Sequence, residues 1–425
     1  MIDHAMSPAL PQTGGADGRP RIIVAGGGAA GFFAAISAAG ANPGAAVTIL
    51  EKSRALLAKV RISGGGRCNV TNACRDPRAL ATRYPRGGRA LIGPLTRFGP
   101  AETVAWFSAR GVRLKAEPDG RMFPVTDTSQ TIIDCLVGEA EKSGVTVIPS
   151  LGIMSVESPA PGRFILRLDD GTTRECEALI WAGGGCRAGS HPVLGLGHSL
   201  VPPVPSLFTF QVDRPWLREL PGISLDPVHL SVPAAGLQET GPILITHAGL
   251  SGPAVLRLSA WGARRLNECG YAFDLQINWL SGTTAEQVLQ EIRNRRETSG
   301  GQAVANAKWP PLPTRLWEQL VMEAGISRET RWSKLDREAA RRLSGLLTKT
   351  ILPVEGKSLN KEEFVTCGGI PLPEVDLKTM ESRLVPGLFF GGETLDIDGI
   401  TGGFNFQAAW TTGWIAGQSA ARVPR

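Results

Sequence analysis

Long apolar runs are missing from this sequence of 425 residues. No stretch approaches the ~20 consecutive apolar residues that cross a bilayer, so the sequence predicts no membrane-spanning helix and no membrane partner. Residues 1–19 are small and polar, without a charged start followed by an apolar core. We therefore expect a flexible N-terminal tail here and no signal peptide.

Cysteine is scarce and scattered along the chain. The seven cysteines form no C-x-x-C pair and no Cys/His cluster with the spacing of a metal site. This pattern argues against structural disulfides and against a zinc centre, and a reducing compartment is the simplest setting for it. We expect a cytoplasmic protein that binds no metal.

Hydrolase patterns are missing as well. Neither a Ser/His/Asp set nor a pair of catalytic carboxylates can be argued from the spacing of these residue types. The composition itself is that of a soluble globular protein, with 42% hydrophobic and 20% charged residues. A chain of 425 residues is long enough for two or three domains.

A glycine-rich turn near the start of the chain is the strongest motif. An apolar run at 22–24 leads into Gly26, Gly28 and Gly31, which have the spacing G-x-G-x-x-G and are followed by small helix-forming residues. The first glycine permits a tight turn, the second lets the backbone approach a pyrophosphate, and the third lets helix and strand touch. The helix N-terminus offers N–H donors to phosphate. This combination predicts a dinucleotide site.

An acidic residue completes this motif. A second apolar strand, at 47–50, ends in Glu51 and Lys52. A carboxylate at this place accepts hydrogen bonds from a ribose hydroxyl and disfavours a ribose 2′-phosphate, which favours FAD or NAD over NADP. The alternative is a glycine-rich turn that binds nothing. Because strand, glycines, helix, strand and acid occur together, we favour the dinucleotide.

Positive charge is concentrated in the segment 54–97. The segment carries nine net positive charges, more than the +6 of the whole chain, because Asp76 alone opposes its ten basic residues: Arg54, Lys59, Arg61, Arg67, Arg75, Arg78, Arg83, Arg86, Arg89 and Arg97. One or two of them would face a dinucleotide pyrophosphate. The surplus is either a solvated loop or a surface for a polyanionic partner such as RNA, and the sequence leaves both open.

A second glycine cluster, RISGGGRCNVTN, occupies residues 61–72. Such a stretch is poor core material and suits a backbone that lies against a ligand. An SGGGRCNVTN loop after a GGGAAG…EK unit resembles the bacterial aminoacetone-oxidase-like flavoproteins, a family that includes BaiN-type and YhiN-like oxidoreductases. The resemblance continues in DGRMFP (119–124), THAGLSGPAVL (246–256) and the run 366–417, and so spans nearly the whole chain.

The resemblance implies an α/β fold with an FAD-binding Rossmann-like domain of the glutathione-reductase type. An antiparallel β domain with a small helical insert is inserted in it. We assign the FAD-binding domain to 20–203 and 366–425, the β-barrel-like domain to 204–282 and 350–365, and the helical insert to 283–349. Short strands of period-2 or apolar character from about 204 onward fit the β domain. Thr283 and Glu286 predict a capping box at the start of a helix.

The family pattern also implies two further edges beside the flavin. The strand 177–185 ends in Ala182, Gly183 and Gly184, and the glycine-rich stretch that normally follows is shortened here. The spacing after this strand imitates a second dinucleotide fingerprint, which we reject because prolines follow in place of an amphipathic helix. A strand at 388–390 and a helix that starts at 402–405 form the second unit. The helix N-terminus at 403–406 would face the flavin pyrimidine ring, where its dipole favours negative charge.

The cofactor is therefore expected to be FAD, with NAD(P)H as its transient electron donor. Ile153, which follows a sheet strand at 145–148, is a candidate contact of the adenine. The full set of predicted cofactor-binding residues is Gly26, Gly28, Ala29, Ala30, Gly31, Glu51, Lys52, Gly65, Gly66, Arg67, Cys68, Asn69, Thr71, Asn72, Ile153, Ala182, Gly183, Gly184, Gly392, Glu393, Asp396, Gly402, Gly403, Phe404, Asn405 and Phe406.

Two side chains are candidates for catalysis. Cys68 lies in the flavin-side loop and would protonate a carbanion after hydride transfer, although cysteines are more often buried fillers. His247 lies in the THAGLSGPAVL motif, where it would otherwise support a turn. Three functions stay open at this point. They are an FAD-dependent reductase of an activated C=C bond, with uridine of ribosomal RNA or a small enone as substrate, an aminoketone or amine oxidase, and a flavin-binding protein without catalysis.

Overall fold

The computed structural model describes residues 18–185, 191–358 and 365–423, which form two compact units. Unit 1 draws on Met1–Pro203, Gly368–Asp398 and Gly402–Arg425, and unit 2 on Val204–Cys367 and Gly399–Thr401. Of the expected N-terminal tail, residues 1–17 lie outside the described residues. The chain leaves unit 1 through β11 (Val201–Ser206) and returns through β19 (Val365–Gly369), and these two strands pair.

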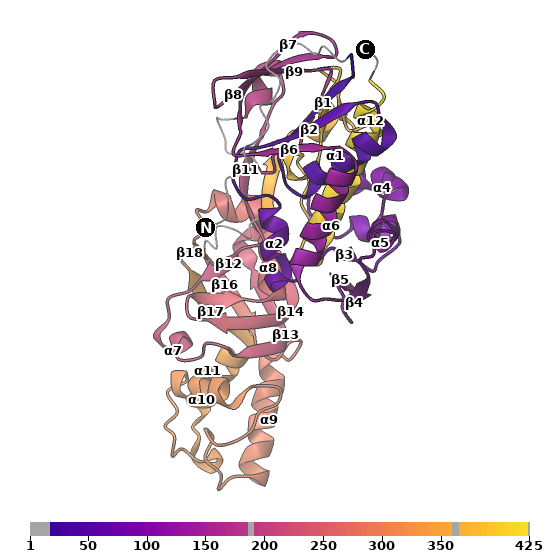
Figure 1. Ribbon diagram of the computed structural model, residues 1–425. Coiled ribbons are helices and arrows are strands. Elements are labelled where there is room, and N and C mark those ends of the chain that lie inside the picture. Colours follow the sequence, from indigo (N-terminus) through magenta and orange to yellow (C-terminus); the bar gives the residue numbers. More distant parts are fainter. Residues whose placement is uncertain (1–17, 186–190, 359–364, 424–425) are drawn as a thin grey trace, which may run out of the picture. The chain divides into compact units, whose positions relative to one another are not determined.

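Unit 1 is built on a seven-stranded sheet that is parallel except for two strands at one edge. Its strands β1, β2 and β6 are labelled in Figure 1. Its strands in spatial order are β20 (Val375–Asp376), β21 (Glu381–Ser382), β22 (Leu388–Phe390), β10 (Ala178–Trp181), β1 (Arg21–Ala25), β2 (Ala46–Glu51) and β6 (Thr146–Pro149). The five strands from β22 to β6 are parallel, and the antiparallel hairpin β20–β21 extends the β22 edge. The predicted strands at 22–24, 47–50, 145–148 and 388–390 all lie in this sheet.

Helices and two small antiparallel sheets complete unit 1. The sheets are β3–β5–β4 and β7–β8–β9. Their strands are β3 (Thr71–Asn72), β4 (Leu114–Ala116), β5 (Arg121–Pro124), β7 (Ile153–Ala160), β8 (Arg163–Leu168) and β9 (Thr173–Cys176). The helices are α1 (Ala29–Ala41), α2 (Ala58–Gly66), α3 (Pro77–Ala81), α4 (Gly88–Arg97), α5 (Pro100–Ser108), α6 (Ser129–Lys142) and α12 (Phe404–Ala420).

Helices α1 and α12 lie side by side with their backbones in contact (Figure 1). A Cβ atom added at Gly413 would lie 2.5 Å from the carbonyl oxygen of Ala30, and one added at Gly417 would lie 2.2 Å from that of Ala34. No side chain fits at such distances, so only glycine permits this approach. The helix that follows the first glycine turn is thereby fixed against the helix of the C-terminal segment.

Unit 2 contains a seven-stranded antiparallel sheet. Its spatial order is β17 (Thr350–Val354), β16 (Phe273–Asn278), β13 (Ser224–Val232), β14 (Leu237–Thr246), β15 (Gly249–Ser251), β12 (Thr209–Gln211) and β18 (Gly356–Ser358). Its helices are α7 (Pro215–Arg218), α8 (Pro253–Glu268), α9 (Ala285–Thr298), α10 (Thr314–Glu323) and α11 (Arg337–Lys349). The parallel sheet of unit 1 and this inserted antiparallel sheet confirm the predicted fold class.

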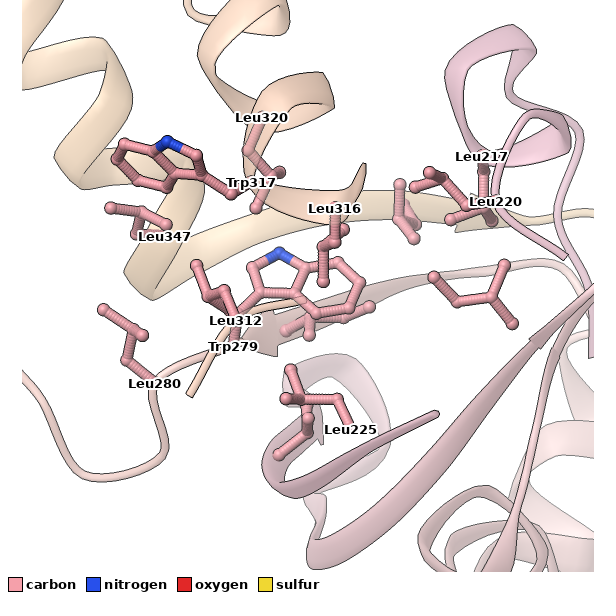
Figure 2. Packing of buried hydrophobic residues seen from close by; sticks show 14 of the residues in the cluster. Leu217, Leu220, Leu225, Trp279, Leu280, Leu312, Leu316, Trp317, Leu320 and Leu347 are labelled. Carbon is pink, nitrogen blue, oxygen red and sulfur yellow. The ribbon is translucent and has the colours of Figure 1, made fainter. Parts of the chain in front are cut away.

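One hydrophobic core joins the sheet and the helices α9 to α11 of unit 2. Figure 2 shows Trp279, which follows β16, in the same cluster as Trp317 and Leu320 of α10. Trp309, Trp317 and Trp332 are all buried in this core. A division of unit 2 into a β domain and a separate helical domain stays a prediction.

Two local features of unit 2 differ from the sequence-based expectation. The capping box at the start of α9 uses Thr284 and Gln287, so its prediction at Thr283 and Glu286 was wrong by one residue. Thr283 instead donates its hydroxyl to the carbonyl oxygen of Leu280. The long helix α8 was not predicted from the sequence.

The glycine contact between α1 and α12 leads to a stability prediction. Gly417→Ala should lower the free energy of unfolding by about 1–3 kcal/mol, because its Cβ meets the backbone of Ala34. Gly138→Ala in α6 is the matched control, because its Cβ meets open space and alanine favours a helix. Urea unfolding followed by circular dichroism measures both. Equal stability of the two variants would contradict the close contact.

Candidate functional site

The glycines of the first turn differ in what surrounds them, and the turn lies at the carboxyl end of β1. A Cβ atom at Gly26 would lie 2.4 Å from the carbonyl oxygen of Ala182, and one at Gly31 would lie 1.9 Å from that of Gly26. At Gly28 an added Cβ would meet nothing within 4 Å. The outer two glycines therefore serve close packing, whereas Gly28, at the N-cap of α1, borders open space.

Glu51 ends β2 beside this turn. Its Oε2 accepts a hydrogen bond from the Gly27 N–H at 2.7 Å, and its Oε1 accepts one from the Ser53 N–H at 2.8 Å. The carboxylate thus ties the glycine turn to the end of β2. Each carboxylate oxygen keeps a further lone pair for a ligand hydroxyl.

The connection that contains Ile153 lies beside the same end of β2. The Leu151 N–H donates to the carbonyl oxygen of Glu51 at 2.9 Å, and a Cβ at Gly152 would lie 3.2 Å from Cβ of Lys52. The Gly152 N–H donates to Asp169 at 2.9 Å, which holds this crossing in place. Glu51, Lys52 and the start of β7 therefore form one edge.

The stretch 64–72 comprises the non-helical end of α2 and the loop after it, and we call it the α2 loop. It is only partly the exposed, ligand-facing backbone that its composition indicates. Gly65 and Gly66 have φ values of +68° and +82°, and an added Cβ would meet nothing within 4 Å at either position. Cys68 and Thr71, in contrast, are fully buried. The description of this stretch as poor core material was therefore wrong for its second half.

Arg67 is engaged by protein groups. Its guanidinium lies 4.0 Å from the ring centroid of Phe123 and donates to Glu117 at 2.7 Å. Asp127 lies 3.6 Å away. The hydrogen bond with Glu117 raises the pKa of Arg67 above its usual value, so the side chain stays charged. Its predicted contact with the cofactor stays a prediction.

Asparagines of this loop hold the N-terminus of α12. The Asn72 side chain donates to the carbonyl oxygen of Gly402 at 3.1 Å. The amide of Asn69 is satisfied when its oxygen accepts from the Gly403 N–H at 2.9 Å and its nitrogen donates to the Thr71 carbonyl oxygen at 3.1 Å. The predicted residues of the 65–72 loop and of the 402–406 turn thus lie together.

A buried polar network strengthens this junction. Gln407 of α12 is fully buried, and its Oε1 accepts from the hydroxyls of Thr71 at 2.5 Å and Thr103 at 3.0 Å. Its amide nitrogen donates to Thr411 at 3.0 Å. Sequence reasoning missed Gln407, because α12 contains a second glutamine, the half-buried Gln418, and residue type alone does not separate the two.

The segment between β22 and α12 contacts α1, the helix that follows the first glycine turn. The Gly392 N–H donates to Thr412 of α12 at 2.8 Å, and a Cβ at Gly392 would lie 2.8 Å from Cβ of Ala30. Glu393 is paired with Lys59 of α2, with Oε2 and Nζ 2.5 Å apart. The Asp396 N–H donates to the carbonyl oxygen of Ile370 at 3.0 Å.

The two catalytic candidates lie in different units. Cys68 is buried in unit 1, and burial raises the pKa of its thiol to about 12, which keeps it protonated at neutral pH. His247 is exposed in the turn between β14 and β15 of unit 2. Their roles in catalysis stay predictions.

An unpartnered imidazole lies near the strand end at Ala182. His191 is buried, and its ring centroid lies 5.0 Å from that of Trp181, the last residue of β10. Among the described residues neither ring nitrogen has a hydrogen-bond partner, and burial lowers the pKa of His191 to about 4. Much of the shortened stretch before it, 186–190, lies outside the described residues. His191 was not predicted as a site residue.

Across residues 18–185, 191–358 and 365–423, no helix is long and apolar enough to cross a membrane. The same residues contain no group of three or more His, Cys, Asp or Glu side chains that would hold a metal ion.

Comparison with known proteins gives consistent matches over nearly the whole chain. The family model described as the HI0933-like protein Rossmann domain matches residues 20–419. The ribosomal RNA dihydrouridine synthase of Escherichia coli (strain K12) is 32% identical over 413 residues, which covers 93% of this chain and 96% of the relative. The corresponding synthase of Haemophilus influenzae is 29% identical over 416 residues, covering 94% and 98%.

A relative with a different named activity matches over the same length. The 3-dehydro-bile acid delta(4,6)-reductase of Clostridium scindens is 30% identical over 414 residues, which covers 95% of this chain and 100% of the relative. The family resemblance found in the sequence is thus confirmed. The chain belongs to the HI0933-like family of FAD-dependent oxidoreductases.

Proposed function

We propose that this chain binds one FAD between two glycine-rich segments of unit 1, the turn from β1 to α1 and the chain from β22 to α12. With electrons from NAD(P)H it reduces an activated C=C bond, that of uridine in ribosomal RNA. The observation that carries the proposal is the junction of Asn69 and Asn72 with the N-terminus of α12, since it joins the loop 65–72 to the C-terminal glycine-rich segment. The close contact of α1 and α12 joins the first glycine turn to the same helix.

The residues present fit FAD. Open space at Gly28 leaves room for a pyrophosphate at the N-terminus of α1, where backbone N–H groups and the helix dipole favour negative charge. Glu51 and Lys52 would meet the adenosine ribose, and Ile153 beside them the adenine. The open glycines of the α2 loop and Gly184 offer backbone to the remainder of the cofactor.

The C-terminal unit would hold the flavin half. Glu393 and Asp396 would meet the ribityl–pyrophosphate region, and the turn at Gly402–Gly403 would place the first N–H groups of α12 against the pyrimidine ring. Phe404 begins the helix about 14 Å ahead of Gly413 along its axis. The N-terminus of α12 therefore extends well beyond the α1 contact, as a second binding point for an elongated cofactor requires.

FAD supplies the hydride-transfer chemistry when bound, and the chain's own residues bind, orient and protonate. Cys68 carries its proton at neutral pH, as a general acid must, but its buried side chain has to become accessible to substrate. His247 is exposed and is the alternative proton donor. We retain both as candidates for this step.

Uridine in ribosomal RNA is the favoured substrate because two relatives with that named activity match nearly the whole chain. The positive charge of segment 54–97 supports a polyanionic partner. A small enone is the second candidate, because the Clostridium scindens relative is named as a bile acid reductase and is similar in identity.

Gly28→Leu tests the cofactor site directly. The backbone at Gly28 has φ −93° and ψ −170°, which any residue adopts, and its Cβ would enter open space. The variant should unfold at the midpoint of the flavin-depleted wild-type protein, and it should purify with less than about a tenth of the wild-type flavin, because its side chain fills the space for the pyrophosphate. Flavin absorbance per chain measures this. Full flavin content in a folded Gly28→Leu protein would refute the placement.

The reaction class has its own test. In anaerobic stopped-flow experiments NAD(P)H should bleach the flavin absorbance, whereas an aminoketone or amine should not. Ribosomal RNA from a deletion strain should lack one dihydrouridine that the wild-type strain contains, as measured by nucleoside mass spectrometry. Reduction by an amine would instead indicate an oxidase. Unchanged RNA with rapid turnover of an enone would indicate the small-molecule reductase, and a flavin that accepts electrons from none of these would indicate a non-catalytic protein.

A further inference from the structure

The ten basic residues of segment 54–97 divide into two groups in the structure. Five are engaged by protein groups: Lys59 with Glu393, Arg61 with Gln130, Arg67 with Glu117, Arg86 with Asp398, and Arg97 with the carbonyl oxygen of Lys378. The high charge of the segment therefore overstates what is available to a partner.

Four of the remaining arginines lie within fifteen residues of one another. All four are exposed: Arg75 just before α3, Arg78 on α3, Arg83 on the chain that joins α3 to α4, and Arg89 on α4. Helices α3 and α4 contact each other. Among the described residues, no salt bridge or side-chain hydrogen bond joins these four guanidinium groups to an acid. Asp76 is the only acid in this stretch, and its carboxylate accepts from the Arg78 N–H at 3.0 Å to cap α3. We call these four side chains the arginine face.

The chain that joins α3 to α4 is held against the segment 397–404, which leads into α12. The hydroxyl of Tyr84, which is buried, donates to the carbonyl oxygen of Phe404 at 2.7 Å. Arg86 forms two hydrogen bonds with the fully buried carboxylate of Asp398. A Cβ at Gly87 would lie 2.5 Å from Ile397. Arg83 and Arg89 thus flank the residues 84–87, which are held against the segment that leads into α12.

We propose that the arginine face binds backbone phosphates of a folded RNA, and that Tyr84 and Arg86 hold this docking surface at a fixed position relative to the N-terminus of α12. This proposal rests on the proposed function, because it places a nucleic-acid substrate beside the helix assigned to the flavin. Guanidinium groups suit phosphate oxygens because they donate two hydrogen bonds in a planar fork. Several phosphates at fixed spacing occur in an RNA backbone.

The test compares two variants with the same loss of charge. R75Q/R78Q/R83Q/R89Q removes the arginine face, and R328Q/R331Q/R337Q/R341Q removes four exposed arginines of unit 2 as a matched control. The probe is protein-free ribosomal RNA, and binding is measured by fluorescence anisotropy over a series of salt concentrations. Loss of four phosphate contacts should weaken binding at least about tenfold at low salt and reduce the slope of log K against log salt by about three.

The control variant should keep the wild-type affinity and slope, and both variants should keep the wild-type flavin content. Equal weakening by the two variants would overturn the proposal in favour of a general charge effect. Unchanged RNA binding together with lost binding to phosphatidylserine vesicles would overturn it in favour of a membrane surface. Because RNA binding is measured without catalysis, its result stands apart from flavin content, on which the proposed function depends.

Discussion

The backbone contact between α1 and α12 is the constraint on which the rest of unit 1 depends. Helices separated by more than 360 residues approach so closely at Gly413 and Gly417 that a single methyl group would collide with the carbonyl oxygens of α1. This contact brings the C-terminal segment onto the first glycine turn. Without it, the two glycine-rich turns of unit 1 would not lie together, and the proposed FAD site would be divided.

A second set of contacts determines where the start of α12 lies. The asparagines of the α2 loop hold the Gly402–Gly403 turn, Gln407 joins two buried threonines, and Tyr84 holds the carbonyl oxygen of Phe404. Polar groups buried without partners cost free energy, so this fully connected network favours one geometry of the junction. The same network connects the α3–α4 turn to the site. The proposed cofactor edge and the proposed RNA-docking surface therefore share one structural support.

Sequence patterns predicted the parts of this structure that obey local rules. The glycine spacing, the acid at Glu51 and the apolar strands follow from the geometry of a βαβ unit, so they are readable from residue order alone. The capping box shifted by one residue, because Thr283 and Thr284 are adjacent and both are three residues ahead of a polar side chain. Helix α8 was within reach, since Val255, Leu258 and Leu266 have helical spacing. The Arg86–Asp398 pair and the Tyr84 hydrogen bond were not, because they join residues more than 300 positions apart.

The central claim is that two glycine-rich segments of unit 1, far apart in the sequence, together bind a single FAD. Isothermal titration calorimetry of flavin-depleted protein with FAD tests it most directly. The account predicts one FAD per chain and a single binding transition. A protein that takes up no FAD, or one that binds two molecules at independent sites, would contradict it.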